Sequence, residues 1–365
     1  MRILFAAGGT GGHINPALAV AKFFKERKSD CEILFVGTPN GMENDLVPRE
    51  GFALKHIEIM GLKRKITFKN LKVLKKYLGS KSAARRIIDE FKPDFVFATG
   101  GYVTVPVIKA AHDAGIPCAV HALDAIPGLA IKMVKKKVDC VFMNFAECEK
   151  HMPGAKAYAV VGNPLRDGLV FNKKKNKPVD DGGKLNILSF AGSLGSLRFN
   201  EIMLEFIKLN SKSGEFKHVH AVGERGMKWV PERMVSMEIE LSRADGIEVV
   251  EYIYNMPERM NDADLIICRS GSSLSEIAAV GKPSVLIPSP NVTGNHQYYN
   301  AKVFRDAGAA IMLEEKELSG SDIYDLAMKL KQNPERLKEM AENAEKLAIF
   351  DATQRIYDKI TSMIK

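Results

Sequence analysis

Short apolar runs recur along the first half of the chain, and segments with helical spacing of apolar residues separate them. These runs lie at Arg2–Ala7, Glu32–Val36, Phe95–Thr99, Cys118–His121 and Cys140–Asn144. Strand-like runs that alternate with helical segments are typical of a mostly parallel sheet with helices on its faces. The pattern therefore predicts an α/β domain in this part of the chain.

The same alternation begins again in the second half. Its apolar runs lie at Leu185–Ala191, His218–Val222, Ile247–Val250, Leu265–Cys268 and Ser284–Ile287. Residues 167–184 between the halves are rich in Lys, Asn, Pro, Asp and Gly, which favours a linker. A chain of 365 residues also exceeds what one hydrophobic core usually supports. We expect two doubly wound, Rossmann-like domains, residues 1–166 and 185–351, facing each other across a cleft at the carboxyl ends of their strands. Residues 352–365 have helical apolar spacing and are expected to pack back on the first domain.

Composition is that of a soluble globular protein. Hydrophobic residues make up 46% of the chain, and no apolar run approaches the ~20 residues that a membrane-spanning helix needs. The five cysteines form no C-x-x-C pair, which favours reduced thiols in a cytoplasm and argues against a zinc cluster; they are Cys31, Cys118, Cys140, Cys148 and Cys268.

The net charge of +9 lies in the first half of the chain. Residues 1–168 carry 26 Lys and Arg against 16 Asp and Glu, and residues 59–88 carry ten Lys and Arg with no acid. Such a span indicates an anionic partner, either a membrane surface or a nucleic acid. It lacks the interleaved aromatic residues expected for base stacking, so nucleic acid is disfavoured. Its apolar stripe, formed by Ile66, Leu71, Leu74 and Leu78, would face a membrane or pack on the core of its own domain.

A glycine-rich loop, GGTGGH at residues 8–13, follows the first apolar run. A strand, a tight loop and a helix N-terminus together can hold an anion, although the same loop can be a turn that binds nothing. The loop lacks the Gly-Lys-Ser/Thr of a Walker A motif. A dinucleotide fingerprint would need its third glycine at Ile14 and an acid after Val36, so nicotinamide binding is disfavoured.

Further unusual loops follow later strand-like runs. They are Ala98–Thr104 (ATGGYVT), Gly192–Ser196 (GSLGS) and Cys268–Glu276 (CRSGSSLSE). Glycine and serine are common at ordinary turns and helix caps, so each loop alone is weak support. Because all of them end strands, together they predict a polar site that tolerates anions.

These motifs resemble the MurG family of glycosyltransferases along nearly the whole chain. GGTGGHINPALAVA, ATGGYV, VGNPLR, CRSG followed by SEIAAVGKP, QYYNA with DAGAA, and DATQRI are similar to the successive signatures of that family. The resemblance implies a GT-B fold and an inverting transfer of N-acetylglucosamine from UDP-N-acetylglucosamine to lipid I, which gives lipid II for peptidoglycan. It also implies a peripheral protein at the cytoplasmic face of an anionic membrane, with a role in cell shape and division.

The resemblance assigns site residues as well. The donor contacts carry over onto Thr10, Gly11, Gly12, Arg166, Ser193, Ile253, Glu276 and Gln297. Glu276 would accept the ribose hydroxyls, the backbone of Ile253 would contact uracil, and Gln297 would bind sugar hydroxyls. Ser193 and Arg166 would bind the diphosphate. The resemblance places the acceptor against His13, Tyr102 and Asp124 in the first domain.

At two places the sequence departs from the family. It reads His121-Ala122-Leu123-Asp124 where the family usually has His-Glu-Gln-Asn, and the loop from Gly271 to Glu276 is one residue shorter. The general base is then His13 or Asp124, unless His13 serves only as a structural histidine. The first change would also permit another acceptor, such as diacylglycerol or a nascent glycan. A third hypothesis for the function is a UDP-N-acetylglucosamine epimerase of the same architecture. We expect no metal or other cofactor, since no Asp-x-Asp pair stands beside the donor loops.

Overall fold

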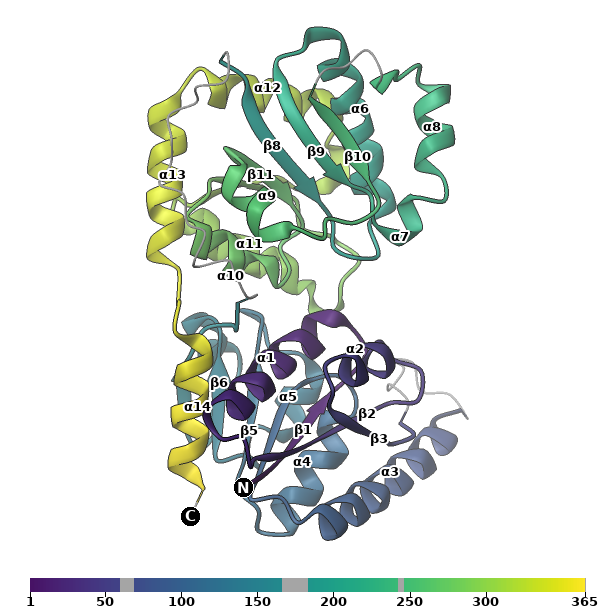
Figure 1. The fold of residues 1–365 in the computed structure, drawn as a ribbon, viewed down its shortest axis with the longest axis vertical. Coiled ribbons are helices and arrows are strands. Elements are labelled where there is room, and N and C mark those ends of the chain that lie inside the picture. Colours follow the sequence, from purple (N-terminus) through teal and green to yellow (C-terminus); the bar gives the residue numbers. More distant parts are fainter. Residues whose placement is uncertain (60–68, 166–182, 242–245, 365) are drawn as a thin grey trace. The chain divides into compact units, whose positions relative to one another are not determined.

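The computed structural model describes residues 1–59, 69–165, 183–241 and 246–364. The chain forms two compact units (Figure 1). Unit 1 comprises Met1–Leu165 and Ile349–Lys365, and unit 2 comprises Arg166–Ala348. Residues 167–182 of the predicted linker lie outside the described ranges.

In the described part of unit 1 the strands form one parallel sheet in the order β3-β2-β1-β4-β5-β6-β7. Their bounds are β1 (Arg2–Ala7), β2 (Glu32–Gly37), β3 (Ala53–His56), β4 (Phe95–Gly100), β5 (Cys118–Ala122), β6 (Cys140–Met143) and β7 (Tyr158–Val160). Strand β1 lies at the centre, where Ile3 is in register with Ile33 of β2 and Phe95 of β4. Its residues Ile3 to Ala7 are buried because helices cover both faces of the sheet.

The helices of unit 1 bury two cores, one on each face of this sheet. They are α1 (Gly11–Arg27), α2 (Glu43–Arg49), α3 (Lys69–Phe91), α4 (Thr104–Asp113), α5 (Leu129–Val134), the 3-10 helix η1 (Ala146–His151) and α14 (Ala352–Met363). Helix α14 packs on α1: Ile356 and Ile360 are buried in the core that contains Phe24, and the ring of Tyr357 lies 4.7 Å from that of Phe24. Gly162 packs against the chain that leads into α14, because at its φ of 80° a Cβ would lie 2.6 Å from Cβ of Ile349.

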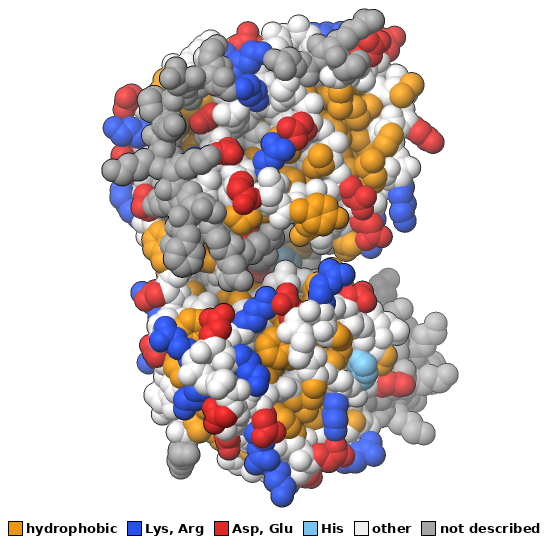
Figure 2. Space-filling view, viewed as in Figure 1, with side chains coloured by type: hydrophobic (Ala, Val, Ile, Leu, Met, Phe, Trp, Pro, Cys, Tyr) orange, Lys and Arg blue, Asp and Glu red, His pale blue; other side chains and the backbone are white. Residues whose placement is uncertain are grey.

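Figure 2 shows Lys and Arg side chains interspersed with Asp and Glu on the visible face of unit 1. Ion pairs of this unit include Lys22 with Glu50 and Lys81 with Asp113. The positive excess of the first half is thus not gathered on this face. The side chains of residues 60–78, which carry the predicted apolar stripe and most of the acid-free span, lie outside the described part of the structure.

In unit 2 the described strands form a second parallel sheet in the order β10-β9-β8-β11-β12-β13. They are β8 (Leu185–Phe190), β9 (Phe216–Ala221), β10 (Ile247–Val250), β11 (Leu265–Cys268), β12 (Ser284–Leu286) and β13 (Ala310–Met312). The helices around this sheet are α6 (Leu197–Ser213), α7 (Gly223–Gly226), α8 (Val230–Ser236), α9 (Met256–Asp262), α10 (Ser273–Val280), η3 (Thr293–Asn295), α11 (His296–Asp306), η4 (Glu315–Glu317), α12 (Gly320–Lys331) and α13 (Pro334–Lys346).

The structure confirms the predicted fold class of two doubly wound parallel-sheet units. Each apolar run predicted as a strand is one, with ends that shift by a residue or two. Strands β3, β7 and β13 were not predicted, and all three lie at sheet edges. Among the described residues, no helix has both the length and the apolar character that crossing a membrane requires.

Candidate functional site

In unit 1 the sheet reverses its strand order between β1 and β4, since β2 lies on one side of β1 and β4 on the other. The loops that follow two such strands diverge, and ligands of doubly wound folds bind at this switch point. Here the loops are Gly8–Thr10 and Gly101–Val103. Both are loops that the sequence singled out.

These two loops touch through glycine. Gly100 has a φ of 141°, and a Cβ there would clash with the imidazole of His13. Gly101 has a φ of 83°, and a Cβ there would clash with the carbonyl oxygen of Gly8. The hydroxyl of Thr99 also donates a 2.6 Å hydrogen bond to the carbonyl oxygen of His13. Glycine is therefore required at both positions, and the backbone of His13 is fixed against β4.

The side chains predicted to contact the acceptor follow neighbouring strands. His13 lies in the first turn of α1 after β1 and is half-buried. Tyr102 follows β4 and is 61% exposed, and Asp124 follows β5 and is half-buried. Because β1, β4 and β5 are adjacent, these three residues all follow the carboxyl ends of neighbouring strands in unit 1.

His121, at the departure from the family motif, belongs to the core. It is fully buried in β5, its Nε2 donates a 2.9 Å hydrogen bond to the carbonyl oxygen of Gly162, and burial lowers its pKa to about 4. It is therefore neutral at pH 7, and it packs against the ring of Phe97.

The loop GGTGGH already holds an anion of the protein itself. The N–H of Gly9 donates a 2.9 Å hydrogen bond to the carboxylate of Glu43, at the start of α2. Thr10, the N-cap of α1, makes no side-chain capping bond, and Gly11 and Gly12 open the helix half-buried. We did not predict a role for Glu43 from the sequence, because it stands in a helical segment without unusual residues.

In unit 2 the strand order reverses between β8 and β11. The loops at this switch point are Ala191–Ser196, which contains Ser193, and Arg269–Ser272, which leads into α10 with Glu276. Gly195 and Gly223 have φ values of 73° and 75°, and their backbones approach too closely for a Cβ on either. The loop that contains Ser193 therefore lies against the turn after β9. There the N–H of Glu224 donates a 3.1 Å hydrogen bond to the carbonyl oxygen of Ser193.

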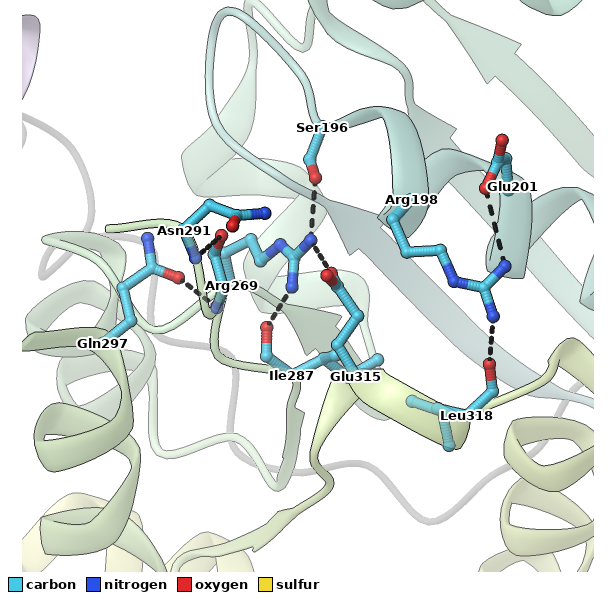
Figure 3. A network of polar contacts seen from close by, with 10 residues as sticks. Ser196, Arg198, Glu201, Arg269, Ile287, Asn291, Gln297, Glu315 and Leu318 are labelled. Atoms are coloured by element: carbon cyan, nitrogen blue, oxygen red, sulfur yellow. Dashed lines mark hydrogen bonds and ion pairs between the residues drawn. The ribbon is translucent and has the colours of Figure 1, made fainter. Parts of the chain in front are cut away.

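A buried arginine joins the switch-point loops of unit 2 (Figure 3). Arg269 is 6% exposed and donates to the hydroxyl of Ser196 at 2.7 Å, to the carbonyl oxygen of Ile287 at 2.9 Å, and to the carboxylate of Glu315. Its guanidinium lies 5.4 Å from the ring centroid of Phe199 in α6. Burial lowers the pKa of Arg269, and Glu315 opposes this shift. Arg269 therefore ties the start of α6 to the ends of β11 and β12. Its loop was recognised in the sequence, but its role was not.

Three more of the predicted donor residues, Glu276, Gln297 and Ile253, follow strands at the carboxyl edge of the sheet of unit 2. Glu276 is in the first turn of α10 and is 7% exposed. Gln297 is in α11, and its amide oxygen accepts from the N–H of Ser289 at 2.8 Å, so its NH₂ group is the part that can reach a ligand (Figure 3). Ile253 follows β10 and is buried. Arg166 lies outside the described residues.

Within the described ranges, no three His, Cys, Asp or Glu side chains are grouped so that they could hold a metal ion. The chemistry that the described residues offer is hydrogen bonding, helix N-termini and a candidate base.

Two parallel α/β units with glycine-rich loops at both switch points are typical of glycosyltransferases of the GT-B architecture. The N-terminal domain of glycosyltransferase family 28 matches residues 3–143, and the C-terminal domain of that family matches residues 186–356. The chain belongs to glycosyltransferase family 28 and is, like that family, a glycosyltransferase.

Its relatives match it from end to end. It is 40% identical over 367 residues to the UDP-N-acetylglucosamine–N-acetylmuramyl-(pentapeptide) pyrophosphoryl-undecaprenol N-acetylglucosamine transferase of Thermoanaerobacter sp. (strain X514), with 100% of both chains covered. It is 37% identical over 369 residues to the enzyme of the same name from Bacillus subtilis (strain 168), again with 100% of both covered.

Solved structures agree on the fold. The crystal structure of Acinetobacter baumannii MurG is similar over 99% of both chains, with a TM-score of 0.81 and 29% identity. The UDP-GlcNAc 2-epimerase of Neisseria meningitidis, solved with UDP-GlcNAc bound, has a TM-score of 0.66 at 16% identity over 99% of this chain and 100% of that one. At that identity the similarity concerns the fold alone.

Proposed function

We propose that the protein transfers N-acetylglucosamine from UDP-N-acetylglucosamine to the N-acetylmuramic acid of lipid I, which gives lipid II. The observation that carries this proposal is the full-length identity of 40% to a transferase named for that reaction. The loops at both switch points support it, because they offer donors to a diphosphate and a candidate base to an acceptor hydroxyl.

The donor binds unit 2 in this proposal. Ser193 and the open N-terminus of α6 receive the diphosphate, and Arg166 adds a positive charge. The carboxylate of Glu276 accepts the ribose hydroxyls, and the backbone of Ile253 hydrogen-bonds the uracil edge. The NH₂ group of Gln297 donates to a hydroxyl of the transferred sugar. In unit 1, Thr10, Gly11 and Gly12 stay candidates for further contacts with the donor.

The acceptor binds unit 1, against Tyr102 and Asp124. Its hydroxyl loses a proton to His13 or Asp124 and attacks C1 of the N-acetylglucosamine from the side opposite UDP. The C1–O bond breaks, both electrons leave with the diphosphate, and the configuration at C1 inverts. Hydrogen-bond donors at the diphosphate stabilise the departing charge.

A lipid-linked acceptor places the reaction at a membrane surface. We infer peripheral binding at the cytoplasmic face, where the acid-free span of residues 59–88 would meet anionic lipids. The product would supply peptidoglycan synthesis, and through it cell shape and division.

The experiment incubates the purified protein with radiolabelled UDP-N-acetylglucosamine and lipid I, diacylglycerol or no acceptor. Label that enters lipid only with lipid I supports the proposal. Transfer to diacylglycerol would replace the acceptor while keeping the reaction class. Conversion to another nucleotide sugar without acceptor would overturn the proposal in favour of an epimerase.

A further inference from the structure

A carboxylate lies buried beneath the glycine-rich loop of unit 1. Glu43, the first residue of α2, is 0% exposed. Its Oε1 accepts hydrogen bonds from the N–H of Thr38 at 2.6 Å and from the Thr38 hydroxyl at 2.7 Å. Its Oε2 accepts from the N–H of Gly9 at 2.9 Å. This single side chain thus joins the loop after β2 to the loop after β1.

The space around this side chain is shaped by glycine. A Cβ at Gly8, Gly37 or Gly41 would come within 3.0 Å of atoms of Glu43. Real Cβ atoms do not approach so closely, so any larger residue at these positions would displace the carboxylate or the loop. Three separate positions of the chain therefore leave room for this group.

Glu43 is ionised at neutral pH. Burial by itself raises its pKa, but the hydrogen bonds from Thr38 and Gly9 outweigh burial, and the pKa lies below its ordinary value. The Gly9 N–H that it uses is no longer available to a phosphate of a ligand. The carboxylate therefore acts as an internal anion that fixes one donor of the loop.

The opposite side of the same loop is held by the loop after β4. The carbonyl of Gly8 lies against Gly101, and the ring of His13 lies against Gly100. The chain turns into α1 between the contact of Gly9 with Glu43 and the contacts with the loop after β4. At this turn the N–H of His13 donates a 3.0 Å hydrogen bond to the carbonyl oxygen of Thr10. The start of α1, and with it His13, is therefore held from two sides, directly by the loop after β4 and through Gly9 by Glu43.

We propose that Glu43 is a positioning residue of the transfer reaction: by holding the N–H of Gly9 it fixes the start of α1 and the place of His13. This inference rests on the proposed function. Glu43 itself touches no substrate in this account, and it acts through the backbone of the loop.

Glu43→Gln tests this role because it changes one acceptor into a donor at almost constant volume. The amide oxygen can keep both donors of Thr38, which turns the NH₂ group toward the N–H of Gly9 and breaks that bond. We expect kcat to fall about 10- to 100-fold, as misplacement by about 1 Å does in other enzymes.

Thr38→Val is the matched control. It removes the hydrogen bond from the Thr38 hydroxyl to the carboxylate and leaves those from the N–H groups of Thr38 and Gly9 in place. We expect a loss of thermal stability comparable to that of Glu43→Gln, with kcat within about twofold of the wild type. A merely structural role of Glu43 would instead lower activity in both variants alike.

Hydrogen exchange of peptides that cover residues 8–14 gives a readout independent of activity. Exchange should be faster in Glu43→Gln and unchanged in Thr38→Val. If Glu43→Gln does not fold, Glu43→Asp, which keeps the charge and shortens the reach, is measured in the same way. A Glu43 variant with wild-type kcat and exchange, or an equal fall of kcat in Thr38→Val, would overturn the inference. If the wild-type protein transfers no sugar to lipid I, the proposed function fails, and the exchange data alone decide whether Glu43 fixes the loop.

Discussion

Nη2 of Arg269 donates a 2.7 Å hydrogen bond to the hydroxyl of Ser196, the residue that precedes α6. A serine at this position usually accepts from an N–H of the first helical turn, and Ser196 makes no such capping bond. Without this capping bond α6 is less stable by about 1 kcal/mol. In return, the first N–H groups of α6 stay open at the carboxyl end of β8, where a helix N-terminus favours an anion.

Glu315→Ala should destabilise unit 2. The substitution leaves the guanidinium of Arg269 buried without its carboxylate, and breaking a buried ion pair in this way costs about 3–5 kcal/mol. The KM for UDP-N-acetylglucosamine should rise as well, because Arg269 holds Ser196. Denaturant unfolding measures the first effect. Glu317→Ala, at an exposed position of the same 3-10 helix η4, is the control and should stay within about 0.5 kcal/mol of the wild type. Equal stability of the two variants would contradict the role of the pair.

Glu276→Ala should raise the KM for UDP-N-acetylglucosamine at least about tenfold. Two hydrogen bonds from the ribose to a carboxylate contribute about 1.5–3 kcal/mol each, and the alanine loses both. Glu276→Gln, which keeps one acceptor oxygen, should raise it less. The measurement is steady-state kinetics with lipid I held at saturation. An unchanged KM in the alanine variant would rule out the ribose assignment.

His13→Ala or Asp124→Asn should lower kcat by roughly 10²–10⁴-fold, the usual effect of removing a general base. We expect this of one variant and not of both, because one group takes the proton. The variant that loses activity should also lose the acidic limb of the pH profile of kcat/KM. If both variants keep near-normal turnover, the proton goes elsewhere, and His13 serves as a structural residue beside Gly100.

The central strands could be predicted because they are buried on both faces. Runs such as Arg2–Ala7 and Leu265–Cys268 are apolar almost throughout, and a parallel strand covered by helices requires this. The edge strand β3 carries no such signal. Three of the four residues of Ala53–His56 are exposed and the fourth is half-buried, and the strand pairs on one side with β2, so its sequence ALKH is free to be polar.

The glycine-rich loops could be predicted, because positive φ values and close backbone approach leave glycine in the sequence. The buried partners could not. Gly9 and Glu43 are 34 residues apart, and Arg269 and Glu315 are 46 apart. Nothing in the sequence around Glu43 or Glu315 distinguishes them from exposed acids. Their roles depend on tertiary contacts that periodicity does not encode.

The protein should sediment with liposomes that contain phosphatidylglycerol and remain in solution with neutral ones. Each Lys or Arg near an anionic surface contributes about 1 kcal/mol, and the span of residues 59–88 has ten of them without an acid. High salt should release the protein, since the Debye length is ~8 Å at physiological ionic strength. Binding should be lost when four lysines of the span are changed together to Glu, namely Lys69, Lys72, Lys75 and Lys76.

A variant with the same change of charge in unit 2 is the control for that experiment. It replaces four exposed lysines by Glu, namely Lys212, Lys329, Lys338 and Lys346. It should keep its binding to anionic liposomes, and both variants should still bind UDP. Two results would mean that the lysines and arginines of residues 59–88 face solvent and do not bind a membrane. They are equal binding to neutral and anionic vesicles, and unchanged binding of the variant with four lysines of this span replaced.

Two histidines buried in unit 2 predict that the protein loses stability in mild acid. The hydroxyl of Ser189 lies 2.7 Å from Nε2 of His218 and 2.7 Å from Nδ1 of His220, and all three side chains are fully buried. One hydroxyl can donate to one neutral ring and accept from the N–H of the other. Burial lowers both pKa values, that of His220 to about 4 and that of His218 well below its ordinary value.

The direction of the pH dependence follows from these shifts. Above pH 6.5, the ordinary pKa, both histidines are neutral in the folded and the unfolded chain, and they do not change the free energy of unfolding. Below pH 6.5 the histidines become protonated in the unfolded chain but stay neutral in the folded chain. The free energy of unfolding therefore falls until the pH reaches the pKa of the folded state. For His220 the loss of unfolding free energy between pH 6.5 and pH 4 is roughly 3 kcal/mol at 1.36 kcal/mol per pKa unit.

His220→Gln, which cannot titrate, should be less stable at pH 7 and show a shallower decline of stability between pH 6.5 and pH 4 in denaturant unfolding. His112→Gln, at an exposed position, should keep the wild-type slope. A wild-type protein equally stable at pH 6.5 and pH 4, or an undiminished slope in His220→Gln, would show that these histidines do not resist protonation.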